Sequence, residues 1–514
     1  MVNYVGDAGA NTHPGTQFKD TLDGQGGNDT LSGQASNDSI LGGDGADRLD
    51  GGAGKDTLLG GLDNDSLFDG WDLDADRLEG GDGADYVLGG AKDHLLGGAD
   101  NDNFELRFDY SGPVSADLGA LTAGGSITFA RTTLSGFENG SLYLSPGDDK
   151  IVCAGMELRY YGMDGGDTLV GGALDDTLDG GLGPADGADV LRGNDGDDRI
   201  TGGPGDKMHG GAGTDTFQLE FRESAFSYDV DFTPVATGGA VLLGDGSVLT
   251  GCEAGYSYWG TGNDRIRTGS QVFGDGVDVY GGGGADTLIG GDGFDSLDGG
   301  LGNDVIRGGG GTDEMSFLSA QQGVALNLNL PDFQDTGGSG MDKVSGVEDL
   351  SGTFFNDRFV GDGQANRLAG FGGSDTLIGG VGDDTLLGGA GFNNGDTEAD
   401  RLAGGAGQDV YCGGGGADLL IWTSVAHTVF GAADSIALLE AQDIIDLEAI
   451  DADVNTAGDQ AFTISATLTG VAGQLAILES GGTTHFYMDV DGDSFADGHI
   501  TAEGDHTGHT AFVL

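Results

Sequence analysis

Single large apolar residues recur every nine residues along much of this chain, separated by glycine, aspartate and small polar residues. Leu49 and Leu58, for example, each follow a glycine-rich stretch of the same form, at residues 42–47 and 51–56. One apolar residue per short unit cannot build a core alone, so each unit buries it by stacking on a neighbour. The period therefore predicts an all-β fold, a parallel β-roll solenoid in which every unit contributes a turn and a short strand.

The repeats occur in blocks separated by segments of a different pattern. In these segments apolar and polar residues alternate, as at residues 104–108 and 324–330, which is the period of a strand. Each segment ends on a similar phrase, so a larger module of insert plus roll is itself repeated; the phrases lie at residues 134–138, 249–253 and 344–348. The predicted domains are a polar leader (1–23), four repeat blocks (24–105, 144–218, 259–316, 352–421), three strand inserts (106–143, 219–258, 317–351) and a C-terminal cap with a secretion region (422–514).

The last segment and three long turns depart from the repeat. Residues 435–450 fit either a short helix or a strand pair, and the sequence after them alternates like antiparallel strands. Because a solenoid needs a cap with a polar outer face, residues 422–514 are predicted to supply it. The turns at residues 69–79, 180–192 and 388–403 are stretched, and such insertions are either tolerated surface loops or recognition loops.

The repeated turn has the chemistry of a calcium site. Glycine permits a sharp reversal of the chain and lets backbone carbonyls converge, and the aspartate at the sixth position supplies charge. Calcium takes six to eight hard oxygen ligands, and stacked turns offer carboxylates and carbonyls without a large side chain between them. We therefore expect on the order of 20 calcium ions, and a weaker site where Asn366 replaces the aspartate.

Two sets of residues are predicted to bind calcium. The sixth-position ligands are Asp29, Asp38, Asp47, Asp56, Asp65, Asp85, Asp102, Asp167, Asp176, Asp198, Asp215, Asp264, Asp286, Asp295, Asp304, Asp313, Asp375, Asp384, Asp409 and Asp418. Near the C-terminus, Asp489, Asp491, Asp493 and Asp497 have the spacing of a compact calcium loop, with a solvated acidic turn as the alternative.

The charge balance agrees with a cationic partner. The chain has 514 residues, 108 of them glycine, and its 86 acidic against 20 basic residues give a formal net charge of −66. This charge excludes nucleic acid and anionic membranes as partners, and it opposes compaction, so the metal-free chain is expected to be expanded. Cys153, Cys252 and Cys412 lie far apart and are predicted to be small buried hydrophobes rather than a disulfide or zinc set. Neither a Sec signal nor a membrane span is expected.

On these repeats, the chain resembles the RTX (repeats-in-toxin) superfamily, and the segment from Asp443–Leu447 to Asp489–Asp497 looks like the C-terminal region of serralysin-type proteases. The resemblance implies type I secretion, an unfolded state in the calcium-poor cytosol, and folding outside the cell on calcium, with the C-terminal region capping the roll. The apolar end at residues 511–514 fits such a secretion signal, although the acidic residue that often precedes it is missing.

No catalytic residue is predicted. The chain contains neither HExxH nor GxSxG, which removes the zinc protease and the usual lipase nucleophile. His499, His506 and His509 with Asp505 could form a transition-metal site, but we expect exposed tail histidines instead. The predicted function is a secreted or surface-associated calcium-binding protein with a structural or adhesive role, with a cell-surface or self-assembly partner. The alternative is an extracellular hydrolase or lyase whose site lies unrecognised in an insert or the cap.

Overall fold

The computed structural model describes residues 1–108, 112–119, 125–153, 155–182, 186–234, 239–269, 277–389, 397–429, 432–457 and 459–514. They form two compact units, residues 1–221 with 234–257, and residues 222–233 with 258–514. Parts of the first two predicted inserts and of the long turns at 180–192 and 388–403 lie outside the described residues. In the described part of the chain, residues 425–427 form the one helix, and no helix is long and apolar enough to cross a membrane.

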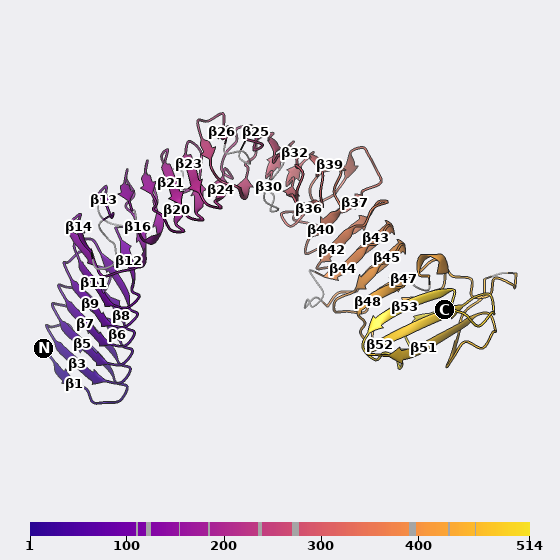
Figure 1. Cartoon of the computed structure of the whole chain (residues 1–514), viewed down its shortest axis with the longest axis horizontal. Coiled ribbons are helices and arrows are strands. Elements are labelled where there is room, and N and C mark those ends of the chain that lie inside the picture. Colours follow the sequence, from indigo (N-terminus) through magenta and orange to yellow (C-terminus); the bar gives the residue numbers. More distant parts are fainter. Residues whose placement is uncertain are drawn as a thin grey trace. The chain divides into compact units, whose positions relative to one another are not determined.

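Alternate strands pair in parallel, which is what a coil of two repeats requires. β3 (Thr21–Gly26) pairs with β5 (Ser39–Asp44), and β4 (Thr30–Gln34) pairs with β6 (Arg48–Asp50). Thr21 lies opposite Ser39 and Thr30 opposite Arg48, so one coil spans 18 residues and adds one strand to each of two sheets. Figure 1 shows these strands stacked one above another. The predicted all-β parallel roll is confirmed.

The first unit contains three sheets. One is formed by β1 (Asn3–Val5), β3, β5, β7 (Thr57–Leu62), β9 (Arg77–Asp82), β11 (His94–Ala99), β15 (Thr132–Ser135) and β14 (Ser126–Phe129). A second is formed by β2 (Thr12–Thr16), β4, β6, β8 (Ser66–Phe68), β10 (Tyr86–Gly90), β12 (Asn103–Arg107), β16 (Asn139–Tyr143), β18 (Glu157–Tyr161), β20 (Thr177–Asp179), β22 (Arg199–Gly202) and β24 (Thr216–Glu220). The third is formed by β13 (Ser115–Asp117), β17 (Lys150–Val152), β19 (Thr168–Val170), β21 (Val190–Asp195), β23 (Lys207–Ala212), β27 (Val248–Thr250) and β26 (Ala240–Leu242).

The second unit repeats this plan. One sheet comprises β25 (Asp229–Asp231), β29 (Arg265–Arg267), β32 (Thr287–Ile289), β35 (Val305–Arg307), β39 (Met341–Ser345) and β38 (Gln334–Asp335), and another comprises β37 (Ala325–Asn327), β41 (Arg358–Val360), β43 (Thr376–Val381), β45 (Arg401–Ala406), β47 (Leu419–Ile421), β49 (Ile444–Asp446) and β54 (Phe512–Val513). A parallel series runs through β30 (Val277–Tyr280), β33 (Ser296–Asp298), β36 (Glu314–Ser316), β40 (Asp349–Ser351), β42 (Arg367–Phe371), β44 (Thr385–Gly389), β46 (Val410–Cys412) and β48 (Asp434–Leu438). The short strands β31 (Gly283–Gly284) and β34 (Leu301–Gly302) pair with each other, and β28 (Ala254–Tyr258) spans the sequence boundary between the units.

Each insert ends one sheet with an antiparallel hairpin. β14 pairs with β15, β26 with β27, and β38 with β39, all antiparallel. The alternating apolar and polar residues of the insert form the extra strand. This strand covers the edge of the sheet, so no further parallel strand can pair there. Within the first unit, the sheet on the other face continues past the hairpin, because β12 pairs directly with β16.

The core is the row of eighth-position side chains. Leu31, Leu49 and Leu58 are fully buried, and the same holds for their counterparts through both units. Cys153, Cys252 and Cys412 are buried free thiols, which confirms that they are small buried hydrophobes. Cys412 packs with Ala369 and Leu387 in a separate small cluster. Because each apolar residue contacts others only in adjacent coils, packing alone ties each coil weakly to the rest.

The C-terminal segment closes the second unit with strands. Residues 435–450 contain β48 and β49 and no described helix, which settles the ambiguity of their pattern. β53 (Gly498–Glu503) pairs with β48 in parallel, and β52 (Thr483–Asp489) and β51 (Gln474–Ser480) follow it antiparallel. β50 (Thr463–Ser465) completes the edge, and the 3-10 helix η2 (Val425–His427) precedes β48 in the chain.

Candidate metal sites

The sixth-position aspartates form hydrogen-bonded ladders inside the roll. The backbone N–H of Asp47 donates to Oδ1 of Asp65 at 2.8 Å, and that of Asp286 donates to Oδ1 of Asp304 at 2.8 Å. Each bond joins neighbouring coils, usually 18 residues apart, 25 at the longest stretched turn and 38 where an insert intervenes between Asp304 and Asp342. One carboxylate oxygen of each aspartate is thus used to hold the turn of the preceding coil.

The second carboxylate oxygen is buried and has no hydrogen-bond partner. This holds for most of the turns, although a buried carboxylate oxygen without a partner is costly. The aspartates with such an Oδ2 are Asp29, Asp38, Asp47, Asp56, Asp65, Asp85, Asp102, Asp167, Asp189, Asp198, Asp215, Asp264, Asp286, Asp304, Asp313, Asp384 and Asp409. An oxygen orphaned so regularly indicates a missing ligand at each turn rather than a series of defects.

In most turns the orphaned oxygen faces the first glycine, and in many of them a backbone carbonyl of the next coil lies beside the same glycine. A Cβ placed on Gly281 would lie 2.7 Å from Asp286 Oδ2 and 2.7 Å from the carbonyl oxygen of Gly299 in the next coil. The first glycine of the turn therefore leaves room between two oxygens of adjacent coils. This cradle, with carboxylate and carbonyl donors only, has the donor chemistry that calcium prefers.

Burial destabilises the charged form of the ladder aspartates when no cation lies beside them. Burial, together with the charge of neighbouring ladder aspartates, raises the pKa of Asp65, Asp189 and Asp286 to about 8. Without a counter-charge, the buried carboxyls would bind protons near neutral pH. Divalent cations remove this cost, and the aligned buried aspartates therefore imply calcium binding.

Shortened turns do not share this arrangement. In Gly-Gly-x-x-Asp turns, the amide of Gly90 donates to Asp93 Oδ2 at 2.7 Å, and that of Gly203 donates to Asp206 Oδ2 at 2.6 Å. Because these turns are one residue shorter than a full turn, the amide of the second glycine lies within hydrogen-bond distance of the carboxylate. These two aspartates thus have no orphaned oxygen to offer a metal.

Most predicted ligands have the orphaned geometry, with a few differences. Asp375 and Asp418 place Oδ2 against the first glycine of their turns in the same way, whereas Asp176 Oδ2 accepts the amide of Gly172 and Asp295 Oδ2 that of Gly291. At Asn366, Oδ1 accepts the amide of Asp362 and Nδ2 donates to the carbonyl of Glu348, so both polar atoms of the side chain are used.

Two aspartates with the same geometry were not among the predicted ligands. Asp189 has an orphaned Oδ2 beside Gly180, and Asp400 Oδ2 lies beside Gly388 and the carbonyl of Gly413. Both end stretched turns. Each therefore lies farther from the first glycine of its turn than the nine-residue repeat requires, and a search at the repeat spacing does not find it. The signal that identifies them is the apolar residue two positions later, Leu191 and Leu402.

The acidic loop near the C-terminus gathers three of its four predicted ligands. Carboxylate oxygens of Asp489, Asp491 and Asp493 lie within 4.8 Å of one another. Asp489 is buried, and its two oxygens accept the amides of Gly492 and Ser494. Asp497 accepts the amide of Val490 through Oδ2 at 2.8 Å and closes the loop.

The C-terminal histidines are not the exposed set that we expected. His499 and His509 are buried, and His499 lies in β53, where it hydrogen-bonds His485 at 3.0 Å and stacks on Tyr487. The expectation of an exposed tail was wrong because the strand pattern continues into this segment. In the described residues, these histidines do not gather into a metal-binding cluster of three ligands.

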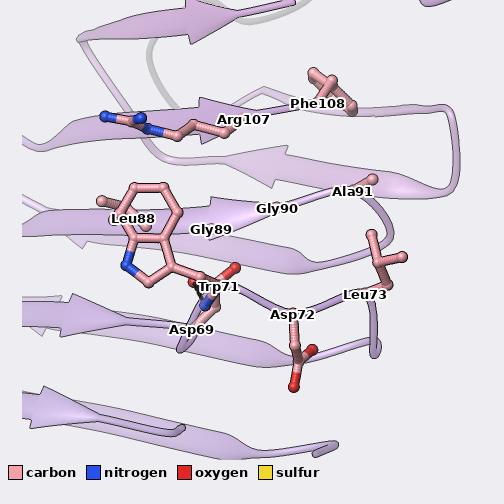
Figure 2. A pocket seen from close by; sticks show the side chains of 10 residues that line it. All are labelled: Asp69, Trp71, Asp72, Leu73, Leu88, Gly89, Gly90, Ala91, Arg107 and Phe108. Atoms are coloured by element: carbon pink, nitrogen blue, oxygen red, sulfur yellow. Dashed lines mark hydrogen bonds between the residues drawn. The ribbon is translucent and has the colours of Figure 1, made fainter. Parts of the chain in front are cut away.

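A pocket beside the first stretched turn contains no orphaned group (Figure 2). Its lining includes the Trp71 indole, which lies 4.5 Å from the Arg107 guanidinium, with Leu73 and Phe108 at the opposite end. The guanidinium also lies 4.3 Å from the centre of the Tyr143 ring. The turn at residues 69–79 thus packs against the roll as a cover for its outer face.

The polar groups of this pocket serve the turn itself. Asp69 Oδ1 accepts the amide of Trp71 at 3.0 Å, and Asp72 Oδ2 accepts the amide of Gly54 at 2.6 Å. Arg107 is paired with Glu105 at 2.5 Å. Each charged side chain of the pocket therefore has a structural role.

Substituting the first glycine of a turn is expected to remove one cation site. In Gly281→Ala, the new Cβ would fill the space between Asp286 Oδ2 and the Gly299 carbonyl, at an overpacking cost of about 1 to 3 kcal/mol besides the lost ion. Native mass spectrometry should count one fewer calcium ion, and the calcium concentration at the folding midpoint should rise. Gly244→Ala is the control, because no atom lies within 4 Å of its Cβ position. Equal ion counts in both variants would contradict the assignment of the cradle.

Comparison with known proteins agrees with the geometry. The family model of the RTX calcium-binding nonapeptide repeat (4 copies) matches residues 5–40, 14–49, 32–67, 72–104, 161–183, 185–217, 280–315, 351–386, 360–393 and 394–420. Together these segments cover half of the chain. A search of curated proteins finds no match. The repeats, their stacked turns and the buried aspartate ladders agree, and the chain belongs to the family of RTX calcium-binding nonapeptide repeat proteins.

Proposed function

We propose that this protein is a secreted scaffold that calcium assembles outside the cell, with a structural or adhesive role at or near the cell surface. The observation that carries the proposal is the series of buried aspartate oxygens without partners. A fold that depends on many weak cation sites suits a medium with calcium near 10⁻⁴ to 10⁻³ M, the range of extracellular modules. In the cytosol the same chain would stay extended, which suits export before folding.

The proposed ligands are the predicted sixth-position aspartates together with Asp189 and Asp400. We place Asp176 last among them, because both of its oxygens already accept amides, from Leu158 and Gly172. Asp295 differs from the other ligands in which oxygen is orphaned: Oδ2 accepts the amide of Gly291, and the buried Oδ1 has no hydrogen-bond partner. The loop at residues 489–497 is proposed as a separate calcium site in the cap. The ion count of on the order of 20 follows from these turns.

The C-terminal segment is proposed to cap the roll and to carry a type I secretion signal. The support is its position in the second unit, where β53 continues the series that ends at β48. The resemblance to serralysin-type C-terminal regions gives the secretion role.

Fractionation of the cells that produce the protein tests its proposed extracellular and cell-surface location. With millimolar calcium in the medium, immunoblotting should detect the chain in the medium and on the cell surface, and an EGTA wash should release the surface fraction because the scaffold unfolds. A matched wash with the same buffer and calcium should release little. Recovery of the chain only from the cytosol, folded in the presence of EGTA, would overturn the proposal.

An extracellular enzyme remains the alternative. A hydrolase and lyase screen of the calcium-loaded chain distinguishes the two functions, since the scaffold should turn over no substrate. Activity that disappears on substitution of a single insert or cap residue would favour the enzyme.

A further inference from the structure

The inserts that follow the first three repeat blocks all end on a similar phrase, and its glutamate contacts the last aspartate of the preceding block. The phrases at residues 134–138, 249–253 and 344–348 each contain Gly-x-Glu, and each follows a hairpin that interrupts the roll. On the face that carries Asp102, Asp215 and Asp313, the next coil offers no regular Gly-Gly-x-Gly-x-Asp turn to complete the last site. A block should therefore lose its final cation unless another segment supplies the ligands.

The glutamate takes over the ladder bond of the missing aspartate. Within the first block, the amide of Asp85 donates to Oδ1 of Asp102 in the next coil at 2.9 Å. At the block end, the amide of Asp102 donates instead to Glu138 Oε2 at 2.8 Å. The same bond joins the other two block ends, from Asp215 to Glu253 at 2.7 Å and from Asp313 to Glu348 at 3.0 Å.

The glycine of the phrase takes over the carbonyl position. A Cβ on Gly97 would meet the carbonyl oxygen of Gly136 and, at 2.6 Å, Asp102 Oδ2, as in the cradle of a regular turn. Gly251 and Gly346 present their carbonyls to Gly210 and Gly308 in the same way. Gly136, Gly251 and Gly346 have φ of +70°, +60° and +61°, a left-handed conformation that glycine adopts without strain.

The last aspartate of each block retains an orphaned oxygen. Asp102, Asp215 and Asp313 are 0% exposed, and Oδ2 of each has no hydrogen-bond partner. This is the same state as that of the aspartates inside the blocks. The buried carboxylate thus points into a cradle whose opposite wall is the Gly-x-Glu phrase.

The length of the glutamate side chain explains the residue choice. In a regular turn the first glycine and the aspartate are five positions apart, whereas in the phrase the glycine and the glutamate are two apart. The backbone of the phrase is shorter, and the additional methylene of glutamate brings its carboxylate to the amide that aspartate reaches in a full turn.

The opposite faces of the first two block ends show what a closure without a cation looks like. There the hydroxyls of Thr132 and Ser247 accept amides from Lys92 and Gly205. The last aspartates on those faces, Asp93 and Asp206, have both oxygens satisfied by amides or ladder bonds. A neutral hydroxyl accompanies a satisfied aspartate, and a glutamate accompanies an orphaned one.

We propose that Glu138, Glu253 and Glu348, with the carbonyls of Gly136, Gly251 and Gly346, complete a calcium site at the end of each of the first three blocks. The inference rests on the proposed calcium ligands within the blocks. The phrase would then supply the last metal ligands of each block, so that the series of cation sites includes the final aspartate of the block.

The test is the ion count of the full chain. Glu→Gln keeps an oxygen for the ladder amide but removes the charge, so E138Q, E253Q and E348Q should each bind one calcium ion fewer by native mass spectrometry, and the triple variant three fewer. A triple variant of exposed cap glutamates, E448Q/E479Q/E503Q, changes the net charge equally and should bind as many ions as the wild type. E138D keeps the charge but is too short, and it should also lose one ion.

The outcomes separate the two proposals. If the wild type itself binds no calcium, the proposed function fails. If the wild type binds many ions and the triple Glu→Gln variant binds as many, the block-end sites are refuted while the ladder sites stand. Circular dichroism at saturating calcium establishes which variants are folded, and the single variants give the count if the triple variant is not folded.

Discussion

Removal of calcium with EGTA is expected to abolish most of the β-sheet signal of this chain and to increase its hydrodynamic radius markedly. The buried ladder carboxylates and a formal net charge of −66 repel one another, and one apolar residue per repeat offers little packing to oppose them. Circular dichroism and size-exclusion chromatography measure both changes. Returning calcium should restore both signals.

Magnesium is the matched control for this experiment. It demands near-ideal octahedral geometry and gives up its water reluctantly, so an equal concentration should leave the chain largely unfolded. The dependence on calcium should be steep, because each coil folds onto an already ordered neighbour. A chain with the same spectrum and radius in EGTA as in calcium would show that packing alone suffices.

Acidification of the metal-free chain is expected to restore part of its structure. Burial raises the pKa of Asp65 and Asp286 to about 8 in the folded state, whereas an unfolded aspartate titrates near 3.9. The folded chain therefore binds more protons between pH 4 and pH 8, and its stability falls as pH rises through this window. In EDTA, the β-sheet signal at pH 4.5 should clearly exceed that at pH 8.

A neutral replacement separates this effect from the general loss of charge. Asp65→Asn mimics the protonated side chain, as Asn366 does naturally with Oδ1 on an amide. The variant should show a weaker pH dependence in EDTA and bind one calcium ion fewer. An exposed substitution such as Asp332→Asn should lower the charge equally without either effect. Identical spectra of the metal-free wild type at pH 4.5 and pH 8 would contradict the role of buried carboxyls.

The period of the sequence was sufficient to predict the roll. Leu49 and Leu58 are nine residues apart, and the strands that contain them lie on opposite faces of one coil, because each coil takes two repeats. The site residues followed from the same count. The backbone amide of a sixth-position aspartate donates to the carboxylate of the aspartate at the same position in the next coil. Asp47 and Asp286 are examples in the two units.

Details that depend on turn length could not be read from the period. Asp93 and Asp206 sit at the expected position, but a turn one residue shorter places a local amide on each carboxylate. Asp189 and Asp400 end longer turns, and Oδ2 of each still lies beside the first glycine of its turn, Gly180 and Gly388. A change of one residue alters which hydrogen bond closes the turn, and spacing alone does not report this.

The role of the inserts also required the structure. Their repeated final phrase was visible in the sequence, but only the contact of Glu138 with the amide of Asp102 relates it to the cation ladder. His499 was misjudged for a similar reason, because the pairing of β53 with both β48 and β52 buries a residue that the sequence places near the chain end.

The most direct measurement is a crystal structure of the calcium-loaded chain with anomalous diffraction data. Anomalous peaks are expected beside the orphaned oxygens, for example between Asp286 Oδ2 and the carbonyl oxygen of Gly299, repeated from coil to coil. Well-ordered ladders with no cation at these oxygens, in crystals grown at millimolar calcium, would contradict it.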